Sequence, residues 1–292
     1  MARKFKTGTS ALAFAVAGVF VAGTAQADLT AADVWTDWQG YLASSGYSVT
    51  ASQSQSGDTL TVSDITLSLE VPGEEGPFTV EMGELSFVEN NDGTVSVLVP
   101  ESLPMRFSGQ SPEEGEVNVV MEYTSSGFDM IASGEPDDLL YNYSADEVGF
   151  SVTGIDAGGE TLDIGKMAFA LGNVIGVSEM KTGDLRKSIQ RLASETLSYT
   201  IDVTDPEEGG TVFVQSEFAG LDVTATGAVP TQVDMTDMAV AIDAGFEADA
   251  NFTFASGQSQ IRIEDAEQTF TADTRSDGGS YDVTLGQGGL SY

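Results

Sequence analysis

Cysteine and histidine are both missing from this chain of 292 residues. Their absence excludes thiol nucleophiles, Ser-His-Asp triads, zinc sites built from thiolates or imidazoles, and histidine proton shuttles. It also excludes disulfides, so that a hydrophobic core must hold the fold, and a chain of this length can form one. An enzyme with this composition would be limited to carboxylates, Ser-Lys pairs, tyrosine or hard cations.

Long hydrophobic runs are nearly absent as well. The single exception, from Ala11 to Ala22, is preceded by basic residues and followed by small residues at the −3 and −1 positions, Ala25 and Ala27. Signal peptidase recognises this arrangement, and the run is too short for a membrane span, which needs about 20 apolar residues. We expect residues 1–27 to be a cleaved signal peptide and the mature protein to be periplasmic, beginning at Asp28 and having no transmembrane segment.

Basic residues are scarce: the chain has 11 Lys and Arg against 46 Asp and Glu, and a net charge of −35. Three of the basic residues and none of the acids lie in residues 1–27, so the mature charge would be 8 − 46 = −38. Charge of this size repels nucleic acid and anionic lipid, and we expect no nucleic-acid partner. We interpret the acidity as adaptation to a salty medium. A hydrophobic content of 41% and 15 Phe argue against disorder.

The hydrophobic pattern predicts two short helices and many strands. After the capping-box pair Thr30 and Asp33, Val34, Trp38 and Leu42 share one helical face within residues 28–46. We expect the two tryptophans, Trp35 and Trp38, to pack this helix on a sheet edge rather than form a ligand platform. A second apolar stripe, with many of the chain's cations beside it, predicts a basic helical joint over residues 178–200. That joint would either bind an acidic partner or neutralise an acidic sheet locally.

Elsewhere the period is two. Leu60 and Val62 alternate with polar residues, and Ile65 and Leu67 do so in the opposite phase, which predicts a bulge at Ser63 and Asp64. The clearest alternation, over 246–254, predicts a strand with one buried face and one wet face, as in antiparallel sheets. Residues 91–93, 205–210 and 277–279 are hairpin-type turn sequences.

We therefore predict a mainly β fold, an elongated antiparallel β-meander or curved sheet that is sandwich-like or groove-like, with two short helices. The expected organisation is a signal peptide (1–27), a helix (28–46), an antiparallel β region (47–177), the basic helical joint (178–200) and a second antiparallel β region (201–292). We expect the last region to be truncated, because the chain stops where another strand begins.

Known catalytic and metal motifs do not fit the chain. Residues 178–183 contain both S-x-x-K and K-T-G of penicillin-binding enzymes, but the two motifs share Lys181, so both roles cannot be filled. Carboxylate pairs suited to glycosidase chemistry are too abundant among 46 acids to be diagnostic. Calcium needs only oxygen ligands, yet residues 89–93 lack EF-hand spacing and residues 278–282 lack the third glycine of the calcium-binding nonapeptide. We assign no catalytic, cofactor-binding or metal-binding residue.

A resemblance to a known family covers most of residues 28–292. It rests on four segments, 33–38, 46–47, 56–64 and 91–97. The chain resembles the exported alphaproteobacterial family known as domain of unknown function 2125. The resemblance implies a fold and export, and it brings no activity, cofactor or site residue. The long amphipathic β-meander is also similar to envelope proteins that handle lipid in a curved β-groove, although fold does not settle function.

Three functions stay open. The first is a non-enzymatic periplasmic protein whose apolar sheet face binds a lipid, another hydrophobic ligand or an envelope partner. The second is a carboxylate-dependent hydrolase of envelope glycans, and the third is a calcium-dependent surface module. We favour the first, because nothing in the chain concentrates reactive groups as an active site would.

Overall fold

The computed structural model describes residues 28–71, 76–111, 115–162, 165–204, 210–231, 237–265 and 267–291. The predicted signal peptide, with Ala25 and Ala27, lies outside these residues, and so does most of the turn at 205–210. Within them the fold is mainly β, as predicted, and has two helices, α1 (Ala31–Ser44) and α2 (Met238–Asp243). Neither helix of the described part is long and apolar enough to cross a bilayer.

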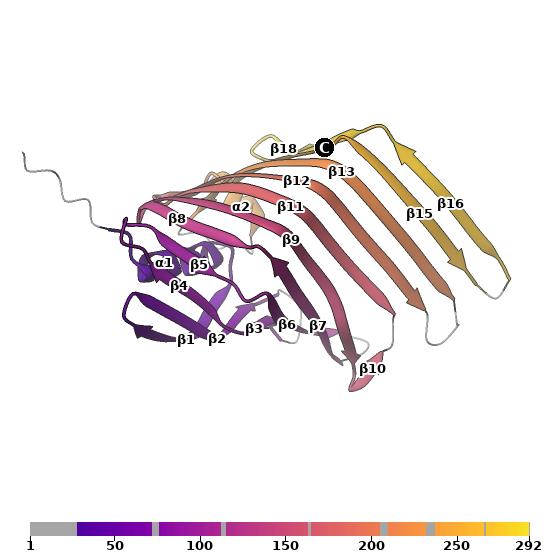
Figure 1. Cartoon of the computed structure of the whole chain (residues 1–292), viewed down its shortest axis with the longest axis horizontal. Coiled ribbons are helices and arrows are strands. Elements are labelled where there is room, and N and C mark those ends of the chain that lie inside the picture. The colour runs from indigo at the N-terminus through magenta and orange to yellow at the C-terminus, as the bar shows by residue number, and fades with distance from the viewer. Residues whose placement is uncertain are drawn as a thin grey trace, which may run out of the picture.

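All the strands belong to one antiparallel sheet that arches over helix α1 (Figure 1). From β9 onward each strand, or pair of collinear strands, lies beside the next one in the sequence. The described strands are β1 (Ser48–Ser56), β2 (Thr59–Leu69), β3 (Phe78–Met82), β4 (Leu85–Glu89), β5 (Val95–Leu98), β6 (Ser102–Ser111), β7 (Gly115–Ser126), β8 (Asp129–Glu135), β9 (Asp138–Ala157), β10 (Glu160–Leu162), β11 (Lys166–Lys181), β12 (Leu185–Thr204), β13 (Thr211–Pro230), β14 (Glu247–Phe254), β15 (Ser256–Glu264), β16 (Thr269–Ser276), β17 (Gly279–Gly286) and β18 (Gly289–Ser291).

Helix α1 forms where its sequence predicts it. The Thr30 side chain caps the helix and accepts a hydrogen bond from the backbone N–H of Asp33, whose carboxylate accepts one from the Thr30 backbone N–H in return. This reciprocal capping satisfies two of the donors that a helix N-terminus leaves unpaired. Val34 and Trp35 are buried against the sheet, and the Trp35 and Trp38 rings both contact Phe87 of β4. Packing on a sheet is thus confirmed, but on its face rather than at an edge.

The core lies at the N-terminal end of the arch, where strands from β2 to β9 close around α1 (Figure 1). The predicted phase change in β2 is confirmed: Leu60, Val62, Ile65 and Leu67 are all buried. Asp64 has a positive φ of 52°, and the register with β1 shifts beside it. A bulge therefore keeps the apolar side chains of both halves of β2 on the core side.

The same change of phase crosses the long strands as a line that we call the crease. Each pairing omits one residue per strand there, so two consecutive apolar-side residues stand three positions apart instead of two. Asn173 and Gly220 have positive φ values of 51° and 65° at this line, and Ala255 separates β14 from β15. The crease residues of the successive strands are Asp146, Asn173, Glu195, Gly220 and Ala255.

The predicted basic helix over 178–200 is wrong. This segment holds the end of β11, a short turn and most of β12, and β12 pairs with β11 on one side and β13 on the other. Two long neighbouring ladders outweigh a weak helical stripe, because strand preference depends on cross-strand packing more than on local propensity. The second helix lies instead at 238–243, where Asp237 caps it.

The turn sequence at 277–279 does not form a hairpin. Strand β16 pairs with β15, and β17 pairs with β14, so the chain continues in one direction through Gly278, whose φ is +117°. Glycine takes this conformation without the steric cost that a Cβ would add. The segment therefore bends one long strand. The predicted turn at 91–93 does join two paired strands, β4 and β5.

Candidate functional site

The long strands have one apolar and one polar face. Antiparallel partners in register project their side chains to the same side of a sheet. Leu171 of β11, Leu197 of β12 and Phe218 of β13 stand in one such row. The next row, on the opposite side, holds Ser198, Glu217 and Gln258. We call the first side, which also faces helix α1, the apolar face, and the second the polar face.

Aromatic rings follow the apolar face from strand to strand. Neighbouring rings have centroids 5.1 to 6.4 Å apart, and Phe169 pairs in register with Tyr199 to join the two halves of the series. Such spacing is typical of favourable ring contacts. The series crosses β7, β9, β11, β12, β13 and β14 and consists of Tyr123, Phe150, Phe169, Tyr199, Phe218, Phe254 and Phe252.

Helix α1 covers only the start of this face. Buried residues of α1 share a core with β9 and with Met180 of β11. Farther along the sheet Leu197 and Leu221 are still buried, but the aromatic side chains Phe169, Phe218 and Phe252 are partly exposed. Exposure reaches 56% for Tyr281 and 57% for Phe270, at the C-terminal end of the sheet. We call this uncovered part, from β11 to β17, the open groove.

A hollow of about 270 Å³ lies in the open groove along the crease. Nearly all of its lining is apolar, and its residues come from β9, β11, β12, β13 and β14: Tyr143, Phe169, Leu171, Gln190, Leu192, Leu197, Leu221, Val223, Ala225 and Phe252. The crease bends each strand here, so side chains of both halves converge on one space. Apolar linings with few polar groups are typical of small-molecule sites.

A second hollow, of about 240 Å³, lies between α1 and the sheet. The helix supplies Trp38, Tyr41 and Leu42, and the sheet supplies residues that include Tyr143 and Gln190. The two hollows share these last two residues, so the space beneath the helix lies next to the hollow in the open groove. Trp38 was interpreted as a packing residue, and it also lines this space.

A buried ion pair closes the wall beneath α1. Asp37 of the helix accepts a hydrogen bond from the Arg186 guanidinium of β12 and another, of 2.8 Å, from the Tyr141 hydroxyl of β9. Burial, and then the neighbouring Asp37 carboxylate, raise the pKa of Tyr141 far above its usual value, so this hydroxyl stays protonated. The three groups thus present no net charge to the groove.

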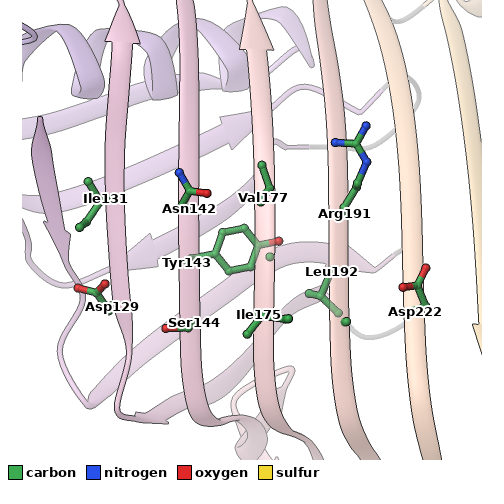
Figure 2. Close-up of a pocket in the computed structure, with 12 residues that line it drawn as sticks. Asp129, Ile131, Asn142, Tyr143, Ser144, Ile175, Val177, Arg191, Leu192 and Asp222 are labelled. Atoms are coloured by element: carbon green, nitrogen blue, oxygen red, sulfur yellow. The ribbon is translucent and has the colours of Figure 1, made fainter.

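The polar face has a hollow of its own, of about 440 Å³ (Figure 2). Ile175 and Val177 lie between Asp129 on one side and Asp222 on the other, and Ile131 stands on the same strand as Asp129. Arg191 also lines it and forms an ion pair with Glu179 at 3.0 Å. Its cation is therefore already neutralised.

The motifs tested in the sequence do not assemble into a site. Ser178 faces the hollow beneath α1, whereas Lys181 is exposed and paired with Asp138 at 2.7 Å, so the S-x-x-K pair is split. At the 89–93 turn, the Thr94 hydroxyl and backbone N–H donate to Asp92 and lower the pKa of its carboxyl. The described residues contain no group of three or more acidic side chains placed to hold a metal ion.

Of the five cations between 166 and 191, Lys181, Arg186 and Arg191 each form an ion pair with an acid. This agrees with local neutralisation, although on strands rather than on a helix. No sequence pattern indicates that Asp37, Tyr143 or Gln190 would line a site, since each is a single polar residue in an apolar pattern. Alternation along 186–194 with a period of two would have placed Arg186 and Gln190 on one face.

Fold and site together define a β-sheet protein with an open apolar groove. Comparison of the chain with family models, with curated proteins and with solved structures found no match. The resemblance to the exported family thus stays a prediction from the residues that carry it.

Proposed function

We propose that this is an exported, non-enzymatic protein that binds an elongated hydrophobic ligand, and that an acyl chain lies along its open groove. The observation that supports this most is the uncovered aromatic and aliphatic face from β11 to β17. Contiguous apolar surface of this kind is uncommon on monomeric proteins and marks ligand or partner sites. The hollow at the crease and the hollow beneath α1 together fall within the range of about 300–1,000 Å³ that is usual for ligand pockets.

The lining fits a binding site better than a hydrolase. Glycosidases need two carboxyl groups roughly 5–9 Å apart across the substrate. Asp37 is the one carboxylate among the lining residues of the two hollows, and its oxygens are bound by Arg186 and Tyr141. A periplasmic location would give such a protein access to envelope lipids. Burial of the ligand's apolar surface would contribute roughly 25 cal/mol of binding free energy for each Å² covered.

A neutral fluorescent dye, 1-N-phenylnaphthylamine, tests the proposal directly. Its emission should rise on binding to the purified protein. Phe169→Glu, which places a charge in the groove, should weaken binding at least about tenfold, because a buried unpaired charge is strongly unfavourable. Ile175→Glu is the matched control: it lies on the same strand but on the polar face, with 63% of its surface exposed, and should leave binding unchanged.

Three results would contradict the proposal. They are no dye binding by the folded protein, loss of binding in Ile175→Glu rather than in Phe169→Glu, or a stable dimer that Phe169→Glu dissociates. The last result would show that the groove receives a second copy of the chain. Sedimentation of both variants beside the wild type separates that case from ligand binding.

A further inference from the structure

Three uncharged polar side chains stand out on the otherwise apolar lining. Tyr143, Ser178 and Gln190 all line the hollow beneath α1, and Tyr143 and Gln190 also line the hollow in the open groove. Ser178 and Gln190 are partners in register on β11 and β12. Within the described part of the chain, none of these side chains has a hydrogen-bond partner, and we call them the polar cluster.

The position of the Tyr143 ring depends on a glycine on the next strand, which leaves room for it. Gly176 pairs with Tyr143 in register, and a Cβ on Gly176 would collide with the ring and its hydroxyl. The ring can therefore lie across β11 toward β12, as Figure 2 shows, and there Tyr143 also lines the hollow of the polar face. Burial raises the pKa of Tyr143, so its hydroxyl remains a donor at neutral pH.

The charges around the cluster disfavour an anionic group. The residues that line the two hollows include no Lys or Arg, and Arg186 nearby is buried and committed to Asp37. On the same strand, Lys187 and Arg191 are exposed and alternate to the polar face. A carboxylate or phosphate in the groove would lose water without gaining a cation, which is costly. An uncharged group would meet free hydroxyl and amide donors and acceptors.

We propose that the polar cluster of Tyr143, Ser178 and Gln190 binds the uncharged hydrogen-bonding group, an ester or hydroxyl, of an acyl ligand whose chain lies in the open groove. This inference rests on the proposed function and adds the class of ligand. Apolar contacts along the groove hold the chain, and the cluster fixes its position and selects a neutral lipid over a fatty acid.

Two ligands of equal chain length test it, 1-decanoylglycerol and decanoate at pH 8, where the acid is ionised. Each competes with bound 1-N-phenylnaphthylamine at concentrations below its aggregation threshold. The glycerol ester should displace the dye at a concentration about tenfold lower or more. Tyr143→Phe and Gln190→Leu should each raise that concentration about 2- to 10-fold, the range expected for one neutral hydrogen bond. Their circular dichroism should match the wild type, and each competition is compared with that variant's own affinity for the dye.

The control is Gln258→Leu, which makes the same change as Gln190→Leu but on the polar face, and it should not change the binding of either ligand. Equal or stronger competition by decanoate, or an unchanged preference in both cluster variants, would overturn the inference while dye binding still supported the groove. If the folded wild-type protein bound neither the dye nor the ester, the proposed function would be overturned instead. Gly176→Ala, which displaces the Tyr143 ring, should reproduce the effect of Tyr143→Phe on the ester.

Discussion

Arg186, the second residue of β12, forms an ion pair with Asp37 of helix α1 across 149 positions of the sequence, and both side chains are almost fully buried. This pair joins the helix to β12, and the Tyr141 hydroxyl of β9 completes it. A Cβ on Gly40 would lie 2.6 Å from the guanidinium, so the close approach of helix and arginine depends on a residue without a side chain. The contact sets the height of α1 above the apolar face and hence the space beneath it.

Removing one partner of this ion pair should strongly destabilise the protein. Asp37→Ala leaves the Arg186 charge buried without a partner, and we expect it to lower the free energy of unfolding by about 3–5 kcal/mol. Urea denaturation followed by tryptophan fluorescence measures this, since both tryptophans lie on α1. The matched control is Asp138→Ala, which removes the exposed pair with Lys181 and should change stability by less than about 1 kcal/mol.

Replacing both partners separates charge from packing. Asp37→Leu combined with Arg186→Met removes both charges and keeps apolar volume, so it should recover much of the loss seen in Asp37→Ala. If the double variant is as unstable as the single one, the pair acts through its hydrogen bonds rather than by neutralising charge.

Stability should fall at alkaline pH because of Tyr141. Its pKa in the folded protein lies far above the usual 10.0, so above pH 10 the unfolded chain releases a proton that the folded protein keeps. The stabilising effect is fully present below pH 10 and declines by about 1.4 kcal/mol for each pH unit above it. Tyr141→Phe should cost about 1.5–3 kcal/mol at pH 8, and that difference from the wild type should shrink between pH 10 and 11.

Tyr281→Phe provides the reference, because this tyrosine is 56% exposed. Its difference from the wild type at pH 8 should be small. A difference for Tyr141→Phe that stays constant between pH 8 and 11 would show that the Tyr141 hydroxyl ionises in the folded state, contrary to its burial.

Features of the fold could be predicted where they depend on residues that are close together in the sequence. The capping box at Thr30 and the phase change at Asp64 both depend on neighbours within a few residues, and both are confirmed. The predicted helix over 178–200 failed because the ladders on either side of β12 come from distant parts of the chain. Polar residues on the apolar face, such as Ser188 and Gln190, also hid the strand period there.

The sequence predicts the type of site, an apolar sheet face, but not the individual polar residues that line it. Alternation indicated an apolar sheet face, and the structure leaves that face open from β11 onward. Its polar residues could not be identified, because Asp37 meets Tyr141 and Arg186 only through tertiary contact. The crease likewise arises from one phase change repeated in register across several strands, which no single strand reveals.

Ionic strength should raise stability. The chain carries a net charge of −35, and the described residues form four ion pairs, three of them on the surface. Self-repulsion among the remaining acids should be screened as the Debye length falls from about 30 Å at 10 mM NaCl to under about 5 Å at 500 mM. Thermal midpoints should rise across that range. A flat midpoint would mean that the acids are too dispersed to interact, and a much larger rise with millimolar calcium would favour a bound cation.

The final prediction concerns β14, where Phe252 faces the open groove and Asp249 the solvent. Phe→Ala in a closed core costs about 3–5 kcal/mol, because truncation leaves a sealed cavity. Phe252 is half-buried and lines an open hollow, so Phe252→Ala should cost only about 1–2 kcal/mol, mainly from lost ring contact with Phe254. Asp249→Ala should change stability by less than about 0.5 kcal/mol.

Ligand binding then distinguishes the two residues more sharply than stability does. Phe252→Ala should weaken the binding of 1-N-phenylnaphthylamine several-fold, since the ring forms part of the hollow, while Asp249→Ala should leave it unchanged. A loss of 3–5 kcal/mol in Phe252→Ala without any change in dye binding would mean that this part of the sheet is a closed core. A large loss in Asp249→Ala with none in Phe252→Ala would mean that β14 presents its other face to the groove. Either result would remove Phe252 from the ligand-binding wall.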